Sequence, residues 1–315
     1  MLIFFLLFFI GLFLGIQIYN FLSGRRFIAD LRDAYKINKM SLREASERWT
    51  SSPKSLVVVS LTTIPSRLPH LDLVLKSLLT QSLAPQKIKV YIPEFSQREQ
   101  CPYIVPDYLH SLSGVEIIKT DDFGPATKFI PAIQTHDPEQ LILVVDDDKI
   151  YDNQLISRLQ IISESMPDRV IASSGWIVPR DLIDKPTNLI RNLFLIPPTP
   201  IHGSRIKKPL QVDIVMGCSG FLIKPKFFDR EALLCRDQVP QALWYVDDVW
   251  VSGHCKVDKF VFPAERCCFH YFKLKNLYKK TSLGLINRGP GSYQYRHNTI
   301  GIQFFKKRWM NKEAL

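Results

Sequence analysis

The sequence predicts an α/β fold in which a mostly parallel central sheet is flanked by helices and preceded by a transmembrane helix. Short apolar runs rich in β-branched residues alternate with segments in which apolar residues recur at helical spacing. These runs lack alternating polar residues, which is typical of parallel strands buried on both faces. The first 22 residues carry no charged side chain and are long enough to cross a bilayer as a helix.

Residues 1–22 are interpreted as an uncleaved membrane anchor. A cleaved signal peptide would have a basic start, a shorter apolar core and a small-x-small exit, and none of these is clear here. Basic residues follow the span and none precedes it, so the positive-inside tendency predicts a cytosolic body; a body in the Golgi lumen is the alternative. The six cysteines would permit disulfides in an oxidising lumen, so they do not decide the compartment.

Composition limits the kinds of partner. With 315 residues and 46% hydrophobic content, the chain can bury a substantial core. The formal net charge of +11 suits an anionic ligand or an anionic membrane surface. Nucleic acid is not expected as a partner, because the basic residues are scattered and no nucleic-acid motif is present. Structural zinc is not expected either, because no cysteines have CxxC spacing.

The chain divides into four predicted parts. These are the anchor at 1–22, a polar and charged stem at 23–54, a globular domain at 55–272 and a basic, aromatic tail at 273–315. The tail is compatible with a loop over phosphates or with membrane contact near Phe304, Phe305 and Trp309.

The globular domain opens with a predicted strand at 56–61, a polar loop and a helix that starts near Pro69. Polar side chains follow this strand, among them Thr62, Thr63 and Arg67. At the carboxyl end of a parallel strand they could contact a nucleotide. The alternative is that they only cap and solvate the turn.

The next unit is expected to contain strands at 87–92 and 115–119 and a helix at 125–134. Asp122 precedes this helix and Lys128 lies one turn into it. Because parallel strands present their ends on one side of a sheet, both residues should lie near Thr62. Lys128 could reach a phosphate and Asp122 could accept from a base or ribose; an ordinary helix cap and a surface lysine are the alternatives.

An apolar strand at 141–145 ends in three consecutive carboxylates, Asp146, Asp147 and Asp148. Side chains two apart in an extended chain point the same way, so Asp146 and Asp148 can converge on one ligand while Asp147 faces elsewhere. Adjacent anions repel one another unless a cation or several donors hold them. This favours Mn²⁺ or Mg²⁺ at the strand end; a solvated acidic turn is the alternative.

The second half is expected to contain a helix at 154–165, a strand at 169–172 and a proline-rich, irregular stretch at 173–210. An insertion of that length is typical of a binding loop or lid. Strand character returns at 212–228 around a turn of small residues. Gly217, Ser219 and Gly220 would let the backbone approach a ligand, and with Trp244 they are assigned to the acceptor side; a β-bulge or hairpin is the alternative.

A second acidic pair, Asp247 and Asp248, lies at the start of a predicted helix within 244–254. Carboxylates at this position can serve catalysis, and they are also favoured merely as helix caps. Beyond a predicted strand at 259–262, His270 follows another apolar stretch. It could ligate a metal, although a packed or hydrogen-bonded histidine is the common alternative.

Taken in order, these pieces resemble a nucleotide-sugar glycosyltransferase of the GT-A type, with its Rossmann-like fold, close to the family 2-like group. The resemblance is carried by the strand followed by TTIPSR, DDFGPATK, the strand ending in DDD, the Gly-rich turn, the W-x-x-DD-x-W-x-x-G segment and the final FH. It covers roughly residues 55–272. No QxxRW motif of processive synthases is present, so polymerisation of a long polysaccharide is not implied.

The acidic strand end is similar to the family's D-x-D motif, which binds the metal and the donor. By that resemblance Asp148 would be the metal ligand and Asp146 the ribose or metal contact. Because three aspartates are consecutive, the alignment with D-x-D leaves the role of Asp147 open. It is assigned to donor binding.

The later motifs imply further roles. Asp247 or Asp248 is similar in place to the catalytic base of inverting members, and His270 is similar to an additional metal ligand. The resemblance implies a UDP- or GDP-sugar as donor and a glycan, lipid or protein as acceptor. It leaves open which of the two carboxylates is the base.

The leading hypothesis is a membrane-anchored, metal-dependent glycosyltransferase, inverting in mechanism. Sugar transfer accumulates negative charge on the departing diphosphate, which a divalent ion can neutralise, and a carboxylate can take the proton of the acceptor hydroxyl. A nucleotidyltransferase or phosphohydrolase that uses the same Asp cluster is one alternative. A catalytically silent GT-A domain that binds sugars is another.

Overall fold

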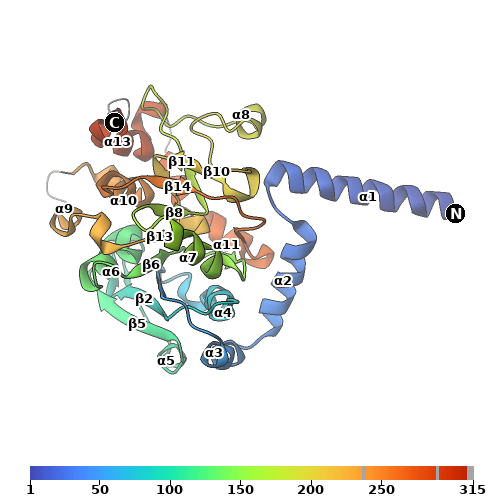
Figure 1. Cartoon of the computed structure of the whole chain (residues 1–315), viewed down its shortest axis with the longest axis horizontal. Helices are drawn as coiled ribbons and strands as arrows, with labels where there is room; N and C mark the ends of the chain where they lie inside the picture. Colours follow the sequence, from blue (N-terminus) through green and yellow to red (C-terminus); the bar gives the residue numbers. More distant parts are fainter. Residues whose placement is uncertain (236–238, 289–290, 311–315) are drawn as a thin grey trace.

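A computed structural model describes residues 1–235, 239–288 and 291–310 of the chain. Within these residues the centre is an eight-stranded sheet (Figure 1) in the order β11 (Leu210–Val212), β14 (Lys259–Val261), β8 (Val170–Ala172), β13 (Phe221–Ile223), β6 (Leu141–Val144), β1 (Val57–Thr62), β2 (Lys87–Pro93) and β5 (Val115–Thr120). Among these described strands, β13 and β11 are antiparallel to their neighbours and the others run in one direction. The predicted α/β class with a mostly parallel sheet is confirmed.

The strand order creates a switch point between β1 and β6. From β1 the chain proceeds outward through β2 to β5, and it then crosses back to place β6 on the other side of β1. Ligands of open α/β sheets bind beyond the carboxyl ends of the strands at such a point. The loops after β1 and β6, which contain Thr63 to Arg67 and Asp146 to Asp148, therefore frame the expected site.

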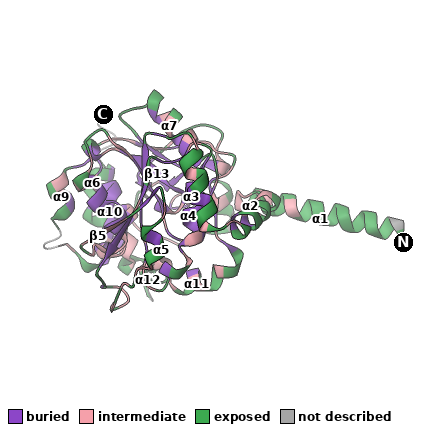
Figure 2. Ribbon diagram, turned by 90° about the horizontal axis from the view of Figure 1, so that it is seen from below, coloured by how far each residue is buried: buried purple, intermediate pink, exposed green. Residues whose placement is uncertain are grey.

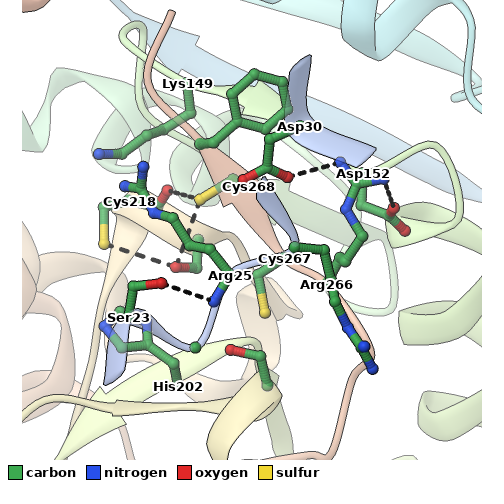
Figure 3. A pocket seen from close by; sticks show the side chains of 15 residues that line it. Ser23, Arg25, Asp30, Lys149, Asp152, His202, Cys218, Arg266, Cys267 and Cys268 are labelled. Atoms are coloured by element: carbon green, nitrogen blue, oxygen red, sulfur yellow. Dashed lines mark hydrogen bonds and ion pairs between the residues drawn. The ribbon is translucent and has the colours of Figure 1, made fainter. Parts of the chain in front are cut away.

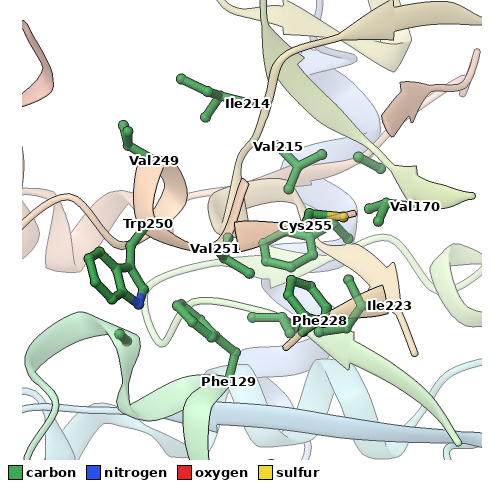
Figure 4. Close-up of a cluster of buried hydrophobic side chains, with 14 of the residues drawn as sticks. Phe129, Val170, Ile214, Val215, Ile223, Phe228, Val249, Trp250, Val251 and Cys255 are labelled. Carbon is green, nitrogen blue, oxygen red and sulfur yellow. The ribbon is translucent and has the colours of Figure 1, made fainter. Parts of the chain in front are cut away.

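Helices cover both faces of the sheet. The main ones are α4 (Asp72–Leu79), α6 (Ile130–Thr135), α7 (Leu155–Ser165) and α10 (Asp247–His254). Successive side chains of a strand point to opposite faces, so Leu143 and Val145 pack in one cluster with α4 and α7. Ile142 and Val144 pack in a second cluster with α6 and α10, part of which Figure 4 shows around Trp250. Both faces of β6 are thus fixed by core packing.

Short elements interrupt the stretch predicted to be irregular at 173–210. β9 (Ser174–Trp176) pairs with β10 (Ile201–His202) and β12 (Ile214–Val215) in a second sheet, and α8 (Leu189–Leu193) lies in the intervening loop. The prediction of an irregular stretch was wrong for β9, β10 and α8, because elements of two to five residues are too short to carry a hydrophobic period. The remaining short elements are β3 (Phe95–Ser96), β4 (Cys101–Pro102), α5 (Asp107–His110), β7 (Ile150–Tyr151), α9 (Arg230–Leu234) and β15 (Cys268–Phe269).

The N-terminal helix α1 (Leu2–Ser23) projects from the body and is exposed along its length (Figures 1 and 2). Within the described residues, Ile3–Ser23 is the stretch long and apolar enough to cross a membrane. The segment predicted to be a stem forms α2 (Phe27–Lys39) and α3 (Leu42–Ser51). α3 begins at a capping box made by Ser41 and Glu44 and buries Ala45 completely in the core.

The C-terminal segment forms α11 (Lys275–Lys280), α12 (Leu283–Arg288), α13 (His297–Phe304) and α14 (Lys306–Met310). Phe305 and Trp309 are buried, and Phe305 packs edge-on against Trp250. The prediction of membrane contact is therefore wrong for Phe305 and Trp309, because their spacing places both rings against the core; Phe304 is exposed. Residues 289–290 and 311–315 of the predicted tail lie outside the described residues.

Substitution of Leu143 tests how strongly β6 is packed. Leu143 is fully buried, so Leu143→Ala should lower the free energy of unfolding by about 2–5 kcal/mol through lost contacts and a cavity. Leu56→Ala is the matched control: the side chain is 67% exposed, and its loss should cost less than about 0.5 kcal/mol. Denaturant unfolding of the detergent-solubilised protein measures both, and equal effects would contradict this burial of β6.

Candidate active site

A cleft of about 640 Å³ lies at the carboxyl edge of the sheet, at the switch point between β1 and β6. Both acidic clusters line it: Asp146–Asp148 after β6, and Asp247–Asp248 in the first turn of α10. The start of α10 is held at this edge because Val249 and Trp250, the next residues, are anchored in the core. The structure therefore brings together two clusters that are far apart in the sequence.

Lys128 connects the two acidic clusters. It ends the 3₁₀ helix η2 (Gly124–Lys128), and its Nζ lies 2.5 Å from Asp146 Oδ1 and 2.6 Å from Asp247 Oδ2. The side chain is buried. Burial lowers the pKa of Lys128, but the facing carboxylates outweigh this, so its pKa lies well above the usual value and the ammonium stays charged. One buried cation thus compensates a carboxylate from each cluster.

Asp147 is occupied by groups from the loop after β1. Thr63 Oγ1 donates to Asp147 Oδ2 at 2.6 Å, and Arg67 Nη1 donates to Oδ1 at 2.7 Å. Arg67 also donates to the side chain and the backbone carbonyl of Thr281, at 2.8 and 2.9 Å. The neighbouring Thr62 donates to Tyr91 O at 2.7 Å, within the sheet. Asp147 therefore has a positioning contact with the β1 loop.

Asp148 and His270 lie against each other at the edge of the cleft. His270 Nδ1 donates to the backbone carbonyl of Asp148 at 2.9 Å, and Asp148 Oδ1 is buried with no hydrogen-bond partner among the described residues. Burial, reinforced by Lys149, lowers the pKa of His270 to about 4, so the imidazole is neutral. Burial raises the pKa of Asp148, but Lys149 and Arg67 outweigh it and the pKa lies below its usual value.

Lys149 is a cation that the sequence prediction did not use. Its Nζ contacts His270 Nε2 and lies 3.7 Å from Asp148 Oδ1. Lys149 and Cys218 also line a smaller pocket of about 140 Å³ behind the cleft, shown in Figure 3. The ammonium thus lies between two cavities, beside the groups predicted to hold a metal.

The chemistry of these donors fits a divalent cation. Among the described residues, no three His, Cys, Asp or Glu side chains form a ready-made metal site. Asp148 Oδ1 nevertheless lacks a hydrogen-bond partner among the described residues, and His270 Nε2, the ring nitrogen that is not bonded to Asp148 O, contacts the Lys149 ammonium. Carboxylate oxygen and imidazole nitrogen are suitable ligands for Mn²⁺. The Lys149 ammonium lies beside both of these atoms, in the place where they would hold a cation, so it would have to move away for the cation to bind.

The small-residue turn contacts the same centre through its first residue. Gly217 N donates to Asp248 Oδ1 at 2.9 Å. A Cβ atom at Gly217 would lie 2.7 Å from Lys128 Nζ and 3.0 Å from Asp146 Oδ1, so no larger residue fits without movement. Burial, with Asp247 nearby, raises the pKa of Asp248 well above its usual range. Asp248 is only partly buried and lines the cleft, so it can meet a ligand.

The other predicted site residues are distributed as follows. Asp122 lines the cleft, but its carboxylate accepts from the backbone of Gln97 and Gly124, each at 2.7 Å. Trp244 lies against Gly124 and lines a neighbouring pocket. Ser219 contacts Cys218 and Cys268 behind the cleft, and Gly220 faces apolar side chains of the sheet. From the stretch 173–210, Trp176 is the described residue that lines the cleft.

Several polar residues that line the cleft were not predicted: Arg98, Lys149, Lys275, Lys279, Asn287, Arg288 and Asn298. The basic tail pointed to Lys275 and Lys279 in general terms, as a loop over phosphates. Arg98 lies between β3 and β4 in a loop without any motif, and its Nη2 donates to Thr281 O at 2.5 Å. Nothing in the sequence signalled that position.

The six cysteines form no disulfide. Cys218, Cys267 and Cys268 are close to one another behind the cleft, and burial raises the pKa of each thiol. They are therefore neutral thiols. The disulfides that the cysteine number would permit do not contribute to this fold.

Replacing Lys128 tests its role between the clusters. Lys128→Met should lower the free energy of unfolding by about 3–5 kcal/mol, because it leaves buried carboxylates without their cation. Lys185→Met is the control, since Lys185 pairs with Asp181 on the surface and such pairs contribute about 1 kcal/mol or less. Thermal and denaturant unfolding at neutral pH measure both. A loss at Lys128 no larger than at Lys185 would refute the bridging role.

No protein-family model and no curated protein sequence matches the chain. Among solved structures, the chain is similar to a crystal structure of GalNAc-T7 with UDP, GalNAc and Mn²⁺. The match has 13% sequence identity and a TM-score of 0.41, and it covers 65% of this chain and 41% of that one. A likeness at this level identifies neither a family nor an activity.

Proposed function

We propose that the protein is a membrane-anchored glycosyltransferase that moves a sugar from a nucleoside-diphosphate sugar to an acceptor hydroxyl. The observation that carries the proposal is the meeting of two acidic clusters, with Lys128 between them, in one cleft at the switch point of a mostly parallel sheet. One cluster supplies groups for a cation and donor, and the other supplies a base. The domain division at 23–54, 55–272 and 273–315 is part of this proposal.

The donor diphosphate is assigned to the basic side of the cleft. Arg67 and Arg98 lie at the loops after β1 and β3, and Lys275, Lys279 and Arg288 contribute from the C-terminal helices. Guanidinium and ammonium groups are suitable partners for phosphate oxygens. Thr62, Thr63 and Asp122 line the same wall and are assigned to the nucleoside end of the donor.

Asp146, Asp148 and His270 would hold the divalent cation, with Mn²⁺ or Mg²⁺ as candidates. When bound, the cation would supply Lewis-acid neutralisation of the charge that develops on the diphosphate. The buried Asp148 Oδ1, which has no hydrogen-bond partner among the described residues, and the neutral His270 support this assignment. Asp147 has a different role: it keeps Arg67 in place beside the donor phosphates.

Asp248 is assigned as the catalytic base. Asp247 is engaged by Lys128, whereas Asp248 lines the cleft and accepts from Gly217 N through one oxygen. In the proposed step Asp248 takes the proton of the acceptor hydroxyl, the acceptor oxygen bonds to the anomeric carbon, and the bond from that carbon to the diphosphate breaks. A single displacement of this kind inverts the anomeric configuration. Gly217 and Trp244 are assigned to the acceptor side.

α1 is proposed to remain in the protein as a single-pass anchor. Its length and apolar character meet the requirement for a span, and the basic residues that follow it favour a cytosolic body. Protease protection of the full chain in sealed vesicles would test the side of the membrane.

Asp248→Asn tests the base. This variant should reduce kcat by about a hundredfold to ten-thousandfold while leaving donor affinity unchanged, because it removes the proton acceptor but keeps the bond from Gly217. A base must be deprotonated to accept a proton, so wild-type kcat should fall when the pH decreases below the pKa of Asp248. Because that pKa is raised, the fall should occur at a higher pH than it would with an ordinary carboxylate as the base. Asp247→Asn is the matched comparison; a larger loss of kcat there than at Asp248 would reverse the assignment.

The donor and cation are tested together. Thermal unfolding is measured with UDP- and GDP-sugars, with and without Mn²⁺, because a ligand that binds the native state raises its apparent stability. One donor should raise Tm only with Mn²⁺, and Asp148→Asn should abolish that increase. Product analysis follows: an intact nucleoside diphosphate and a new glycoside are expected. Release of pyrophosphate, or of phosphate without a glycoside, would instead identify a nucleotidyltransferase or a phosphohydrolase.

A further inference from the structure

Exposed apolar side chains surround the inner end of α1. We call this group the collar; it consists of Phe27, Ile28, Leu31 and Tyr35 on α2 and Ile190, Leu193, Phe194 and Ile196 on and after α8. Phe194 is 69% exposed and Ile190 66%. Large exposed apolar groups that cluster, unlike scattered ones, mark an interaction surface.

The collar is held in place by hydrogen bonds at the end of the anchor. Arg205 Nη2 donates to Leu22 O at 2.5 Å and its Nη1 donates to Asn192 O at 3.2 Å, so one guanidinium joins α1 to α8. Asn20 Oδ1 accepts from Phe27 N at 2.9 Å, which joins α1 to α2. In Figure 1, α2 and α8 lie at the end of α1 that meets the body.

A tight turn fixes the same junction. Gly24 has φ of +67°, and a Cβ atom there would lie 2.9 Å from Arg205 Cγ. A larger residue would therefore strain the turn and crowd Arg205. The anchor is thus seated on the body at a defined angle, rather than joined to it by a loose tether.

Basic side chains accompany the apolar ones. Arg26, Arg32, Lys36 and Lys39 are exposed in or beside α2, and Arg191 lies in α8. Apolar groups beside lysines and arginines are typical of surfaces that lie in the interface of an anionic membrane. Because the collar is continuous with a helix that is apolar enough to span a bilayer, the lipid around that helix is the occupant within reach.

We propose that the collar docks the body onto an anionic lipid bilayer, with its apolar side chains in the interfacial layer and its basic side chains on lipid head groups. This inference rests on the proposed retention of α1 as an anchor. It adds a second membrane contact, which prevents the body from rotating freely about the span. None of the collar residues lines the cleft, so the collar is distinct from the proposed active site.

Fluorescent labels on the full-length chain test the proposal. One cysteine is introduced in place of Ile28, Ile190 or Phe194, in a background in which the accessible Cys101 and Cys235 are replaced by Ser. Each variant carries an environment-sensitive dye and is reconstituted as one copy per nanodisc of phosphatidylcholine with phosphatidylglycerol. Leu12→Cys, inside the proposed span, is the lipid reference. Ile161→Cys is the water reference. Ile161 lies in α7, is not part of the collar, and at 65% exposed matches the exposure of Ile190.

The collar labels are expected to give a blue-shifted emission close to that at Leu12 and to be quenched by spin-labelled lipids, whereas Ile161 stays water-like. The double variant Arg32→Glu, Lys36→Glu should reduce the shift at Ile28 and leave Leu12 unchanged. Water-like emission from Ile190 and Phe194 would overturn the proposal. A shift that appears only with two copies per disc would also overturn it, in favour of a contact between copies.

Sugar transfer is measured on the same samples, which separates the two proposals. A chain that buries the collar labels without transferring sugar would retain the docking inference and reject the enzyme assignment. A chain that transfers sugar while the collar labels remain in water would do the reverse.

Discussion

The ammonium of Lys128, buried between Asp146 and Asp247, is the interaction on which the centre of this protein depends. Carboxylates from two distant parts of the chain converge at one sheet edge, and their mutual repulsion would oppose that approach in a poorly solvated cleft. A buried charge is tolerated when it is paired and hydrogen-bonded. Lys128 provides that pairing for both clusters at once, so the start of α10 can lie beside the end of β6.

The sheet and the two clusters were predictable, because strand periodicity and the common edge of parallel strands are local and topological rules. The side-chain contacts within the site could not be predicted from the sequence. For Lys128 the sequence left open a contact with a phosphate or an ordinary surface position; in the structure it is buried and binds carboxylates, which sequence spacing could not indicate. Lys149 directly follows the triple Asp, but nothing in the sequence shows that it turns toward His270. Phe305 and Trp309 suggested a membrane surface and are instead packed in the core.

The triple Asp also illustrates what side-chain alternation can decide. Asp147 was expected to face away from its two neighbours; Thr63 and Arg67 occupy both of its oxygens, but the same Arg67 Nη1 also donates to Asp148 Oδ2 at 3.4 Å, so Asp147 and Asp148 share a partner. Asp146 instead faces Lys128, and Asp148 lies beside His270. Which carboxylate meets which partner depends on loops after β1 and beyond β15, whose conformation no periodic pattern encodes.

The contacts of Arg67 limit how this protein can be truncated. The same guanidinium holds Asp147 and, through two hydrogen bonds, Thr281 in the C-terminal segment. A chain cut before Thr281 would lose both of these hydrogen bonds and keep only Tyr278 from that segment, whose ring centroid lies 5.5 Å from the guanidinium carbon, among the contacts described. The C-terminal segment is therefore not dispensable for the cleft. A chain without it would keep Arg67 paired with Asp147 but would lose the hydrogen bonds that hold this guanidinium from the other side.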